Sequence, residues 1–273
     1  MVKRIACFLT CGYTEAGAMQ FFLKKINHQF EYKQYLPNKT IKKKGDAKNI
    51  SSSISGLTGE ALLEKIYAII EKHRTEISGC AAILLEDDLD DRFSNFSIQE
   101  ISEYNRKIKI KIQEKLGCKK PVFILYASPE VESWFVADWE NSFQYLYCKT
   151  NLVEDVEYNA RKFFTHHLKK YIEKDILKEY CNDLEAYGVF DGQYVKLSDQ
   201  LIQAIQWDIK EYVQKLSGVN QQYVEQIVSS RCLYYSKKLH GDRMLRNIHP
   251  EEVIKECFHY FREAYYELRQ FES

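Results

Sequence analysis

The sequence is short of proline and glycine, with 4 and 11 of them among 273 residues, and 39 basic residues balance 39 acidic ones. So few chain-breaking residues argue against a loop-rich secreted module and favour long helices. The balanced charge excludes a global electrostatic attraction to nucleic acid or to a membrane surface. Any contact with nucleic acid must therefore be local.

Long apolar runs and closely spaced cysteines are also missing. No segment approaches the roughly 20 apolar residues of a membrane-spanning helix, and the apolar run in MVKRIACFLTCG is too short for a secretory signal. The 8 cysteines form no CxxC pair and show no zinc-site spacing. We therefore expect a soluble protein without membrane contact, with reduced thiols, in the cytoplasm.

Nucleotide-binding and nucleophile motifs are absent too. The chain has no GxxxxGK[ST] loop and no GxSxG turn. These absences argue against ATP hydrolysis by a phosphate-binding loop and against a serine hydrolase of the nucleophile-elbow type. If ATP drives the system, another protein binds it.

The first half of the chain alternates strand and helix patterns. Apolar segments of strand length lie at 5–10, 80–86 and 121–127, and helical periodicity occurs at 15–27, 59–79 and 98–116. Ser128 and Pro129 are typical of the start of another helix. Strands separated by helices predict an α/β fold, with a parallel sheet and right-handed crossovers.

The second half shows helix patterns only. These lie at 156–187, 198–216, 221–235 and 250–271. We therefore expect an α/β domain over 1–150 and a mostly helical region over 151–273. The helices of this region could form an independent bundle or cover the sheet.

Acidic residues follow three of the predicted strands. Glu15 comes after the first strand and a tight turn; the central strand leads into Asp87, Asp88, Asp90 and Asp91; and Glu130 and Glu132 follow the third. The carboxyl ends of parallel strands meet at one edge of the sheet. Carboxylates held close together repel one another unless a cation neutralises them, and oxygen ligands suit Mg²⁺ or Mn²⁺. The sequence therefore predicts a divalent-metal site at this edge.

The spacing of Asp88 and Asp90 adds to this prediction. In an extended backbone the two side chains point the same way while Leu89 points back to the core, so the two acids could share one ion. The alternative is that each acid is only solvated or interacts with a helix dipole. Trp134 and Trp139 are expected in the core.

Three motifs together resemble a known group. The segments LTCGYTEAGAMQFFL, ILLEDDLDD and ASPEVESWFVADW, in this order, resemble the Toprim-like proteins of the RloB and abortive-infection type, relatives of nucleases that accompany ATPases in bacterial phage defence. That resemblance implies a Toprim-like sheet and a metal-dependent nuclease. It also implies site roles for Glu15, for Asp88 and Asp90, and for Glu130 and Glu132.

A later segment extends the resemblance, and one position departs from it. YSKKLHGDRMLRNI is similar to a Lys-x-x-His-Gly segment of the same group, which would place Lys237 and His240 near the site, steadying phosphate charge. Cys11 stands where the group usually has glutamate, and cysteine is a poor ligand for Mg²⁺. Either Glu15 takes over, or Glu86 or Asp87 substitutes, or catalysis is altered or lost.

The function expected from these residues is a Mg²⁺- or Mn²⁺-dependent phosphodiesterase that acts on DNA or RNA in anti-phage defence, with a partner ATPase. Lysines at 39–48 could contact backbone phosphates or only keep a loop solvated. Two alternatives stay open. One is a non-catalytic Toprim-like subunit that docks on the ATPase, and the other is a phosphoryl-accepting domain that uses Asp87 or Asp88. The chain could also form oligomers.

Overall fold

The computed structural model describes residues 3–10, 12, 14–37, 56–148, 169–177, 183–186, 196–215 and 235–272. Within these ranges a four-stranded sheet has the order β2-β1-β3-β4, and every neighbouring pair is parallel. The strands are β1 Arg4–Phe8, β2 Glu31–Leu36, β3 Ala82–Asp88 and β4 Val122–Ala127. The predicted α/β fold, a parallel sheet flanked by helices and followed by a helical C-terminal region, is confirmed.

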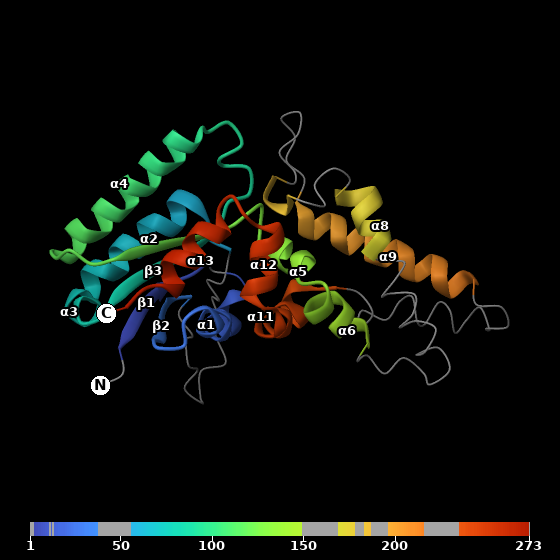
Figure 1. The fold of residues 1–273 in the computed structure, drawn as a ribbon, viewed down its shortest axis with the longest axis horizontal. Helices are drawn as coiled ribbons and strands as arrows, with labels where there is room; N and C mark the ends of the chain where they lie inside the picture. Colours follow the sequence, from blue (N-terminus) through green and yellow to red (C-terminus); the bar gives the residue numbers. More distant parts are fainter. Residues whose placement is uncertain are drawn as a thin grey trace, which may run out of the picture.

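Helices cover both faces of the sheet (Figure 1). One face carries α2, α3 and α4, with bounds Gly59–Lys72, Arg74–Ser78 and Ile98–Leu116. The other face carries α1, α5, α11, α12 and α13, with bounds Glu15–Ile26, Glu132–Ala137, Asp242–Asn247, Pro250–Glu256 and Phe261–Arg269. The described residues also form α6 Tyr145–Cys148, α8 Lys169–Tyr171 and α9 Leu197–Lys215.

Short turns of other helix types complete the described structure. The π-helical turns are Glu140–Gln144, Ile172–Leu177 and Lys237–Gly241, and Leu184–Ala186 is a 3₁₀ turn. No helix in the described ranges combines the length and apolar character needed to cross a bilayer.

Side chains of alternating strand residues build a core on each face. Ile5 and Cys7 of β1 belong to the cluster formed with α1 and the C-terminal helices, whereas Ala6 and Phe8 belong to the one formed with α2 and α4. This is the period of two that a strand imposes. The C-terminal segment therefore shares a core with the first strands. The predicted boundary near residue 150 lies outside the described residues.

Aromatic contacts fix the C-terminal helices on the sheet. Trp134 of α5 stacks on Phe22 of α1, with ring centroids 5.2 Å apart, and lies 4.9 Å from Phe261 of α13. Phe271 lies 5.1 Å from Phe30 and 5.2 Å from Phe123. Trp134 and Trp139 are buried, so their expected core placement is confirmed.

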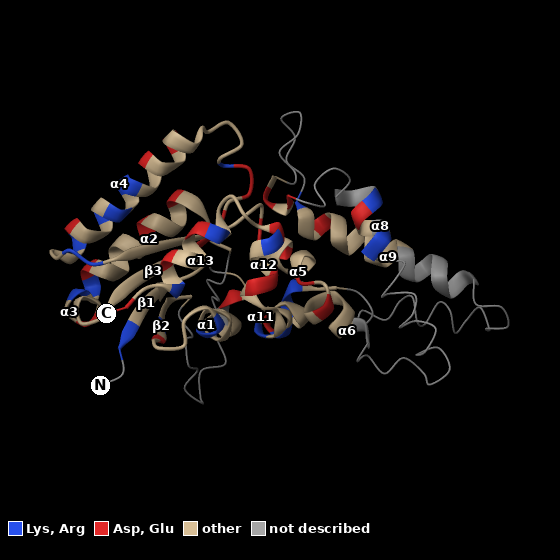
Figure 2. Ribbon diagram, in the orientation of Figure 1, with Lys and Arg blue, Asp and Glu red and all other residues tan. Residues whose placement is uncertain are grey.

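The helix α4 matches its predicted bounds because its ends are encoded locally. Ser97 Oγ accepts from the Glu100 backbone N–H, while the Glu100 carboxylate accepts from the Ser97 N–H at 2.8 Å. Gly117 ends the helix at φ 70°, a conformation that glycine adopts without strain. Basic and acidic residues lie side by side along this helix (Figure 2).

Two predicted helix patterns are interrupted in the structure. The 59–79 helix is broken at His73 into α2 and α3, and the 250–271 helix is broken between α12 and α13. The 198–216 helix is present as α9. The described parts of the predicted 156–187 helix are short helical turns. Residues 221–234 of the predicted 221–235 helix lie outside the described residues.

The predicted helix start at Ser128 and Pro129 is wrong. The Ser128 hydroxyl donates to the Glu185 carbonyl at 2.7 Å, so it does not cap a helix. The Pro129 carbonyl accepts from the Asp90 N–H at 2.7 Å and ties the end of β4 to the chain after β3. Helix α5 begins only at Glu132.

Candidate functional site

Five carboxylates gather at the carboxyl edge of the sheet, and we call them the acid cluster: Glu15, Glu86, Asp88, Glu130 and Glu132. They come from the start of α1, from β3 and from the turn that leads into α5. All but Asp88 are at most 2% exposed. The charge of Asp88 interacts with those of Glu15, Glu86 and Glu130, and the charge of Glu15 with that of Glu132. The acids that follow three strands therefore meet.

The pleat of β3 selects which acids join the cluster. Leu84 faces the core beneath α1, and Glu86 and Asp88 follow it at intervals of two, on the same face. Asp87 points to the other face, where it lies 2.7 Å from an Arg92 guanidinium nitrogen and accepts from the Gly59 N–H at 3.2 Å. Asp87 is therefore committed to an ion pair away from the cluster.

Thr10 connects the end of β1 to the acidic strand. Its backbone N–H donates to the Glu86 carboxylate at 2.9 Å, and its hydroxyl accepts from the Asp88 N–H at 3.1 Å. The second oxygen of Glu86, Oε1, has no hydrogen-bond partner within the described structure. Of the two carboxylate oxygens of Glu86, only Oε2 is therefore fixed by a hydrogen bond within the described structure.

Lys237 is bound between two acids of the cluster. Its Nζ lies 2.6 Å from Glu130 Oε2 and 3.0 Å from Glu132 Oε2. Glu130 also accepts from the Ser198 N–H at 2.7 Å, and Glu132 accepts from the Tyr235 hydroxyl at 2.6 Å. The charge of Lys237 is therefore largely used by these two acids.

This ion pairing affects the pKa values of the three groups differently. Burial acts to raise the pKa of Glu130, but Lys237 and Ser198 outweigh it and hold the pKa below its ordinary value. Burial raises the pKa of Glu132 against the pull of Lys237. The two acids overcome the effect of burial on Lys237 and raise its pKa. Lys237 is an ammonium at neutral pH.

For Glu15 and Asp88 the charge of Lys237 only partly offsets burial. Burial is the main reason that the pKa of Glu15 rises to about 7, with a further rise from Glu132. Burial and the neighbouring Glu15 raise the pKa values of Glu86 and Asp88 well above the ordinary range. Glu15 Oε2 is buried without a hydrogen-bond partner in the described part of the chain. These three acids need protons or a cation.

Gly12 makes room for the Glu15 carboxylate. A Cβ atom at position 12 would overlap Glu15 Oε2. A side chain at position 12 would therefore displace the Glu15 carboxylate from its present place.

The oxygen atoms of the acid cluster are the type of ligand that a hard divalent cation prefers. All five groups are carboxylates, and Glu15 and Glu86 each keep a buried oxygen that no described residue bonds. In the described residues, however, no three His, Cys, Asp or Glu side chains are already placed as a metal site. Glu15, Glu86 and Asp88 would have to turn toward a common centre to hold an ion.

Asp90 does not extend the row begun by Asp88. Its φ of 51° is left-handed, so the extended backbone expected for 88–90 is not present. Its carboxylate lies 3.8 Å from Lys196 Nζ, and it lines a separate pocket described below. The turn that closes β3 therefore separates the two aspartates.

His240 lies beside the cluster rather than in it. Its Nδ1 accepts from the Ser236 N–H at 3.1 Å, and its ring faces Tyr235 at 6.4 Å. Burial, with the neighbouring Arg243, lowers its pKa. Cys11 and the lysines at 39–48 lie outside the described residues, so their predicted roles stay predictions.

Several groups at the site gave little signal in the sequence. Glu86 could have been identified from its interval of two to Asp88 within a buried strand. No such pattern marks Thr10, Ser198 and Tyr235, because the acids that they bond lie far away in the sequence. The separations are 76 residues for Thr10, 68 for Ser198 and 103 for Tyr235.

The acid cluster predicts a stability that falls as pH rises. The pKa of Glu15 is 4.5 ordinarily and about 7 in the folded chain, so between these values the folded state keeps a proton that the unfolded state has lost. Glu15 alone should lower the free energy of unfolding by about 2–3 kcal/mol between about pH 5 and about pH 8. Glu86 and Asp88 act in the same direction.

Urea unfolding at the two pH values measures this effect. Glu15→Gln, which has no proton to lose, should be less sensitive to pH than the wild type. A wild-type stability that stays level or rises over this range would contradict the raised pKa.

Comparison of the chain with protein-family models, curated proteins and solved structures found no match. The likeness to Toprim-like proteins therefore rests on the three motifs and the Lys-x-x-His-Gly segment.

Proposed function

We propose that the chain is a Mg²⁺- or Mn²⁺-dependent phosphodiesterase that acts on nucleic acid. One observation carries the proposal: Glu15, Glu86 and Asp88 are packed together at the carboxyl edge of a parallel sheet with raised pKa values, and two of their buried oxygens lack partners among the described residues. Holding three acids in this way costs stability. A divalent cation bound by the three acids would offset that cost, and it would also provide a catalytic role for them.

Each group of the cluster has a role in this proposal. Glu15, Glu86 and Asp88 would hold the cation, which supplies Lewis-acid stabilisation of phosphate oxygens and a more acidic water. Glu130 and Glu132 hold Lys237 at the rim, where 36% of its side chain is exposed and can meet a phosphate. Tyr235 and Ser198 fix the two acids that position this lysine.

The biological setting is proposed from the resemblance alone. It places the activity in the bacterial cytoplasm, in anti-phage defence, beside a partner ATPase. The scattered cysteines fit a reducing compartment. The motif likeness also implies metal ligands at Asp90 and Glu130 and a phosphate contact from His240. The geometry supports these roles less than it supports metal binding by Glu15, Glu86 and Asp88.

A non-catalytic docking subunit is the second candidate. It is favoured by Lys237, which already neutralises Glu130 and Glu132, and by the lack of a ready-made metal site among the described residues. In that case the acids would be structural and the chain would bind no cation.

Incubation with nucleic acid separates the two candidates. Single- and double-stranded DNA and RNA would each be treated with the protein in Mn²⁺, in Mg²⁺ and in EDTA, with and without the ATPase. The enzyme predicts cleavage that requires the metal. Neither metal binding nor cleavage in any of these mixtures would overturn the proposal.

A further inference from the structure

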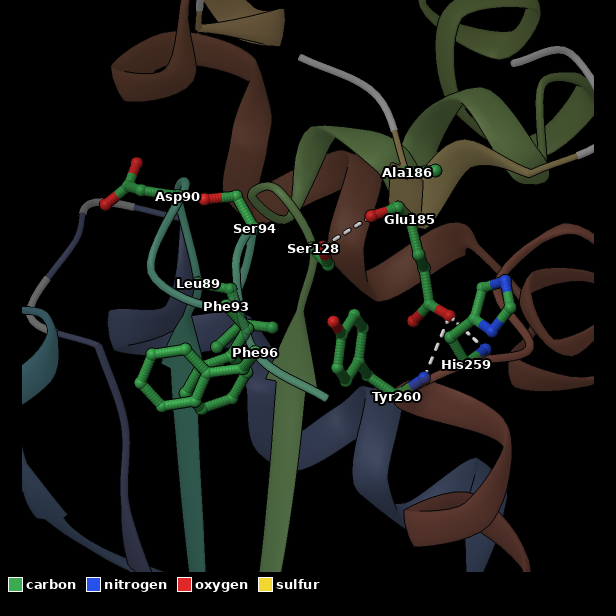
Figure 3. A pocket seen from close by; sticks show the side chains of 10 residues that line it. All are labelled: Leu89, Asp90, Phe93, Ser94, Phe96, Ser128, Glu185, Ala186, His259 and Tyr260. Atoms are coloured by element: carbon green, nitrogen blue, oxygen red, sulfur yellow. Dashed lines mark hydrogen bonds between the residues drawn. The ribbon is translucent and has the colours of Figure 1, made fainter. Parts of the chain in front are cut away.

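A pocket of about 270 Å³ opens at the carboxyl edge of the sheet, lined by residues that follow β3 and β4 (Figure 3). Its walls come from the loop after β3, from the end of β4, from the turn at 184–186 and from the segment before α13. Pockets for drug-sized ligands are usually about 300–1,000 Å³. Its occupant is therefore small.

One wall is an aromatic platform. Phe93 packs edge-on against Tyr104 and Tyr126, at 5.5 and 5.4 Å, and these contacts fix its ring. Phe96 lies 5.3 Å from Phe93 and is 44% exposed. Tyr260 stands opposite, 6.1 Å from Phe93 (Figure 3). A held ring with an exposed neighbour is a suitable surface for stacking a planar group.

The facing wall is held by a buried carboxylate. Glu185 accepts the backbone N–H groups of Tyr260 and Phe261, both at 2.9 Å, and also that of His259. This fixes the chain that carries Tyr260 and His259. The Ser128 hydroxyl adds a bond from the end of β4 to the Glu185 carbonyl. The pocket is thus a built feature rather than a gap between loops.

The polar groups of the pocket are mixed. Asp90 and Glu185 are acidic and His259 is basic. Glu185 is, however, bonded by backbone N–H groups, and His259 Nε2 lies 3.0 Å from Asp183. The Asp90 carboxylate, 3.8 Å from Lys196 Nζ, can accept from the N–H groups of a neutral ring.

The pocket and the acid cluster share parts of the backbone. Leu89 and Asp90 line the pocket and directly follow Asp88, and Ser128 comes two residues before Glu130. The pocket therefore adjoins the cluster along both chain segments, with its rings on the α2 and α4 side of the sheet and Glu86 and Asp88 on the α1 side.

We infer that this pocket binds one unpaired nucleobase of a nucleic-acid strand, stacked on Phe96, while the adjoining phosphate lies toward the acid cluster. The inference rests on the proposed function for its ligand. It adds that the substrate is a single strand or a strand with an unstacked base, because a base paired in a duplex cannot enter.

Binding of a labelled single strand in EDTA tests the inference without cleavage. Strands of about ten nucleotides, as DNA and as RNA, fall within the usual site sizes. Phe96→Ala should weaken binding about tenfold or more, since it removes the stacking surface. Phe96→Tyr keeps an aromatic ring and should bind within about twofold of the wild type.

Phe21→Ala is the matched control. Phe21 lies on α1 and is 45% exposed, close to the value for Phe96, with Arg246 over its ring. It should bind the strand like the wild type. Melting temperatures would show that all variants are folded.

The outcomes separate this inference from the proposed function. If Phe96→Ala binds as tightly as the wild type, or if the wild type binds neither strand, the pocket is not a base site, whatever the Mn²⁺ assay shows. Binding that depends on Phe96 without any cleavage would support the pocket and count against the phosphodiesterase.

Discussion

Asp88→Asn is expected to lower Mn²⁺-dependent cleavage by at least about 10³-fold, because it removes the central ligand of the proposed cation. The charge of Asp88 interacts with the charges of Glu15, Glu86 and Glu130. Glu15 likewise interacts with three members, Glu86, Asp88 and Glu132. Loss of the charge of Asp88 should therefore weaken cation binding strongly.

The same change should not unfold the protein. The pKa of Asp88 is raised by burial and by neighbouring acids, so its charge is a cost in the folded state. Asparagine keeps an oxygen that can accept from the Val131 N–H, as Asp88 Oδ1 does at 3.1 Å. We expect the thermal midpoint of the variant to match or exceed that of the wild type in EDTA.

Asp91→Asn is the matched control for this experiment. Asp91 is exposed and lies three positions further along the chain. The variant should cleave at the wild-type rate. Full cleavage by Asp88→Asn, measured on the same strand and at the same Mn²⁺ concentration, would contradict the proposed ligand.

Lys237→Met is expected to lower the free energy of unfolding at neutral pH by about 2–3 kcal/mol. Breaking a buried ion pair by removing one partner typically costs about 3–5 kcal/mol, and the partial exposure of Lys237 reduces that cost. The change leaves Glu130 and Glu132 buried without their cation. Urea unfolding measures the loss.

Two further variants identify the cause of that loss. Lys238→Met alters the next, exposed residue and should change stability by less than about 0.5 kcal/mol. Adding Glu132→Gln to Lys237→Met should recover part of the stability, because it removes one uncompensated charge. Equal stabilities of the Lys237 and Lys238 variants would show that the pair contributes little.

The sheet and α4 could be predicted because their signals are local. The apolar runs of β1, β3 and β4 are bounded by polar turns, and α4 has its capping box and terminal glycine in its own sequence. Strand β2, with the sequence EYKQYL, was not predicted, because half of its side chains are polar, whereas β4, the other edge strand, is a continuous apolar run.

The meeting of the acids could be predicted from topology, but their partners could not. Parallel strands bring Glu15, Asp88 and Glu132 to one edge whatever the details of the loops. The bonds of Lys237, Ser198 and Tyr235 to this cluster depend on how distant helices pack. Asp90 was placed wrongly because the pattern DLD does not reveal that the strand ends at Asp88.

The most direct test is the anomalous diffraction of a crystal soaked in Mn²⁺. We expect a manganese peak coordinated by Glu15, Glu86 and Asp88, with the side chains turned toward it, and the loss of that peak in Asp88→Asn. No peak at saturating Mn²⁺, with the three acids still apart and Lys237 still bound to Glu130 and Glu132, would contradict this expectation.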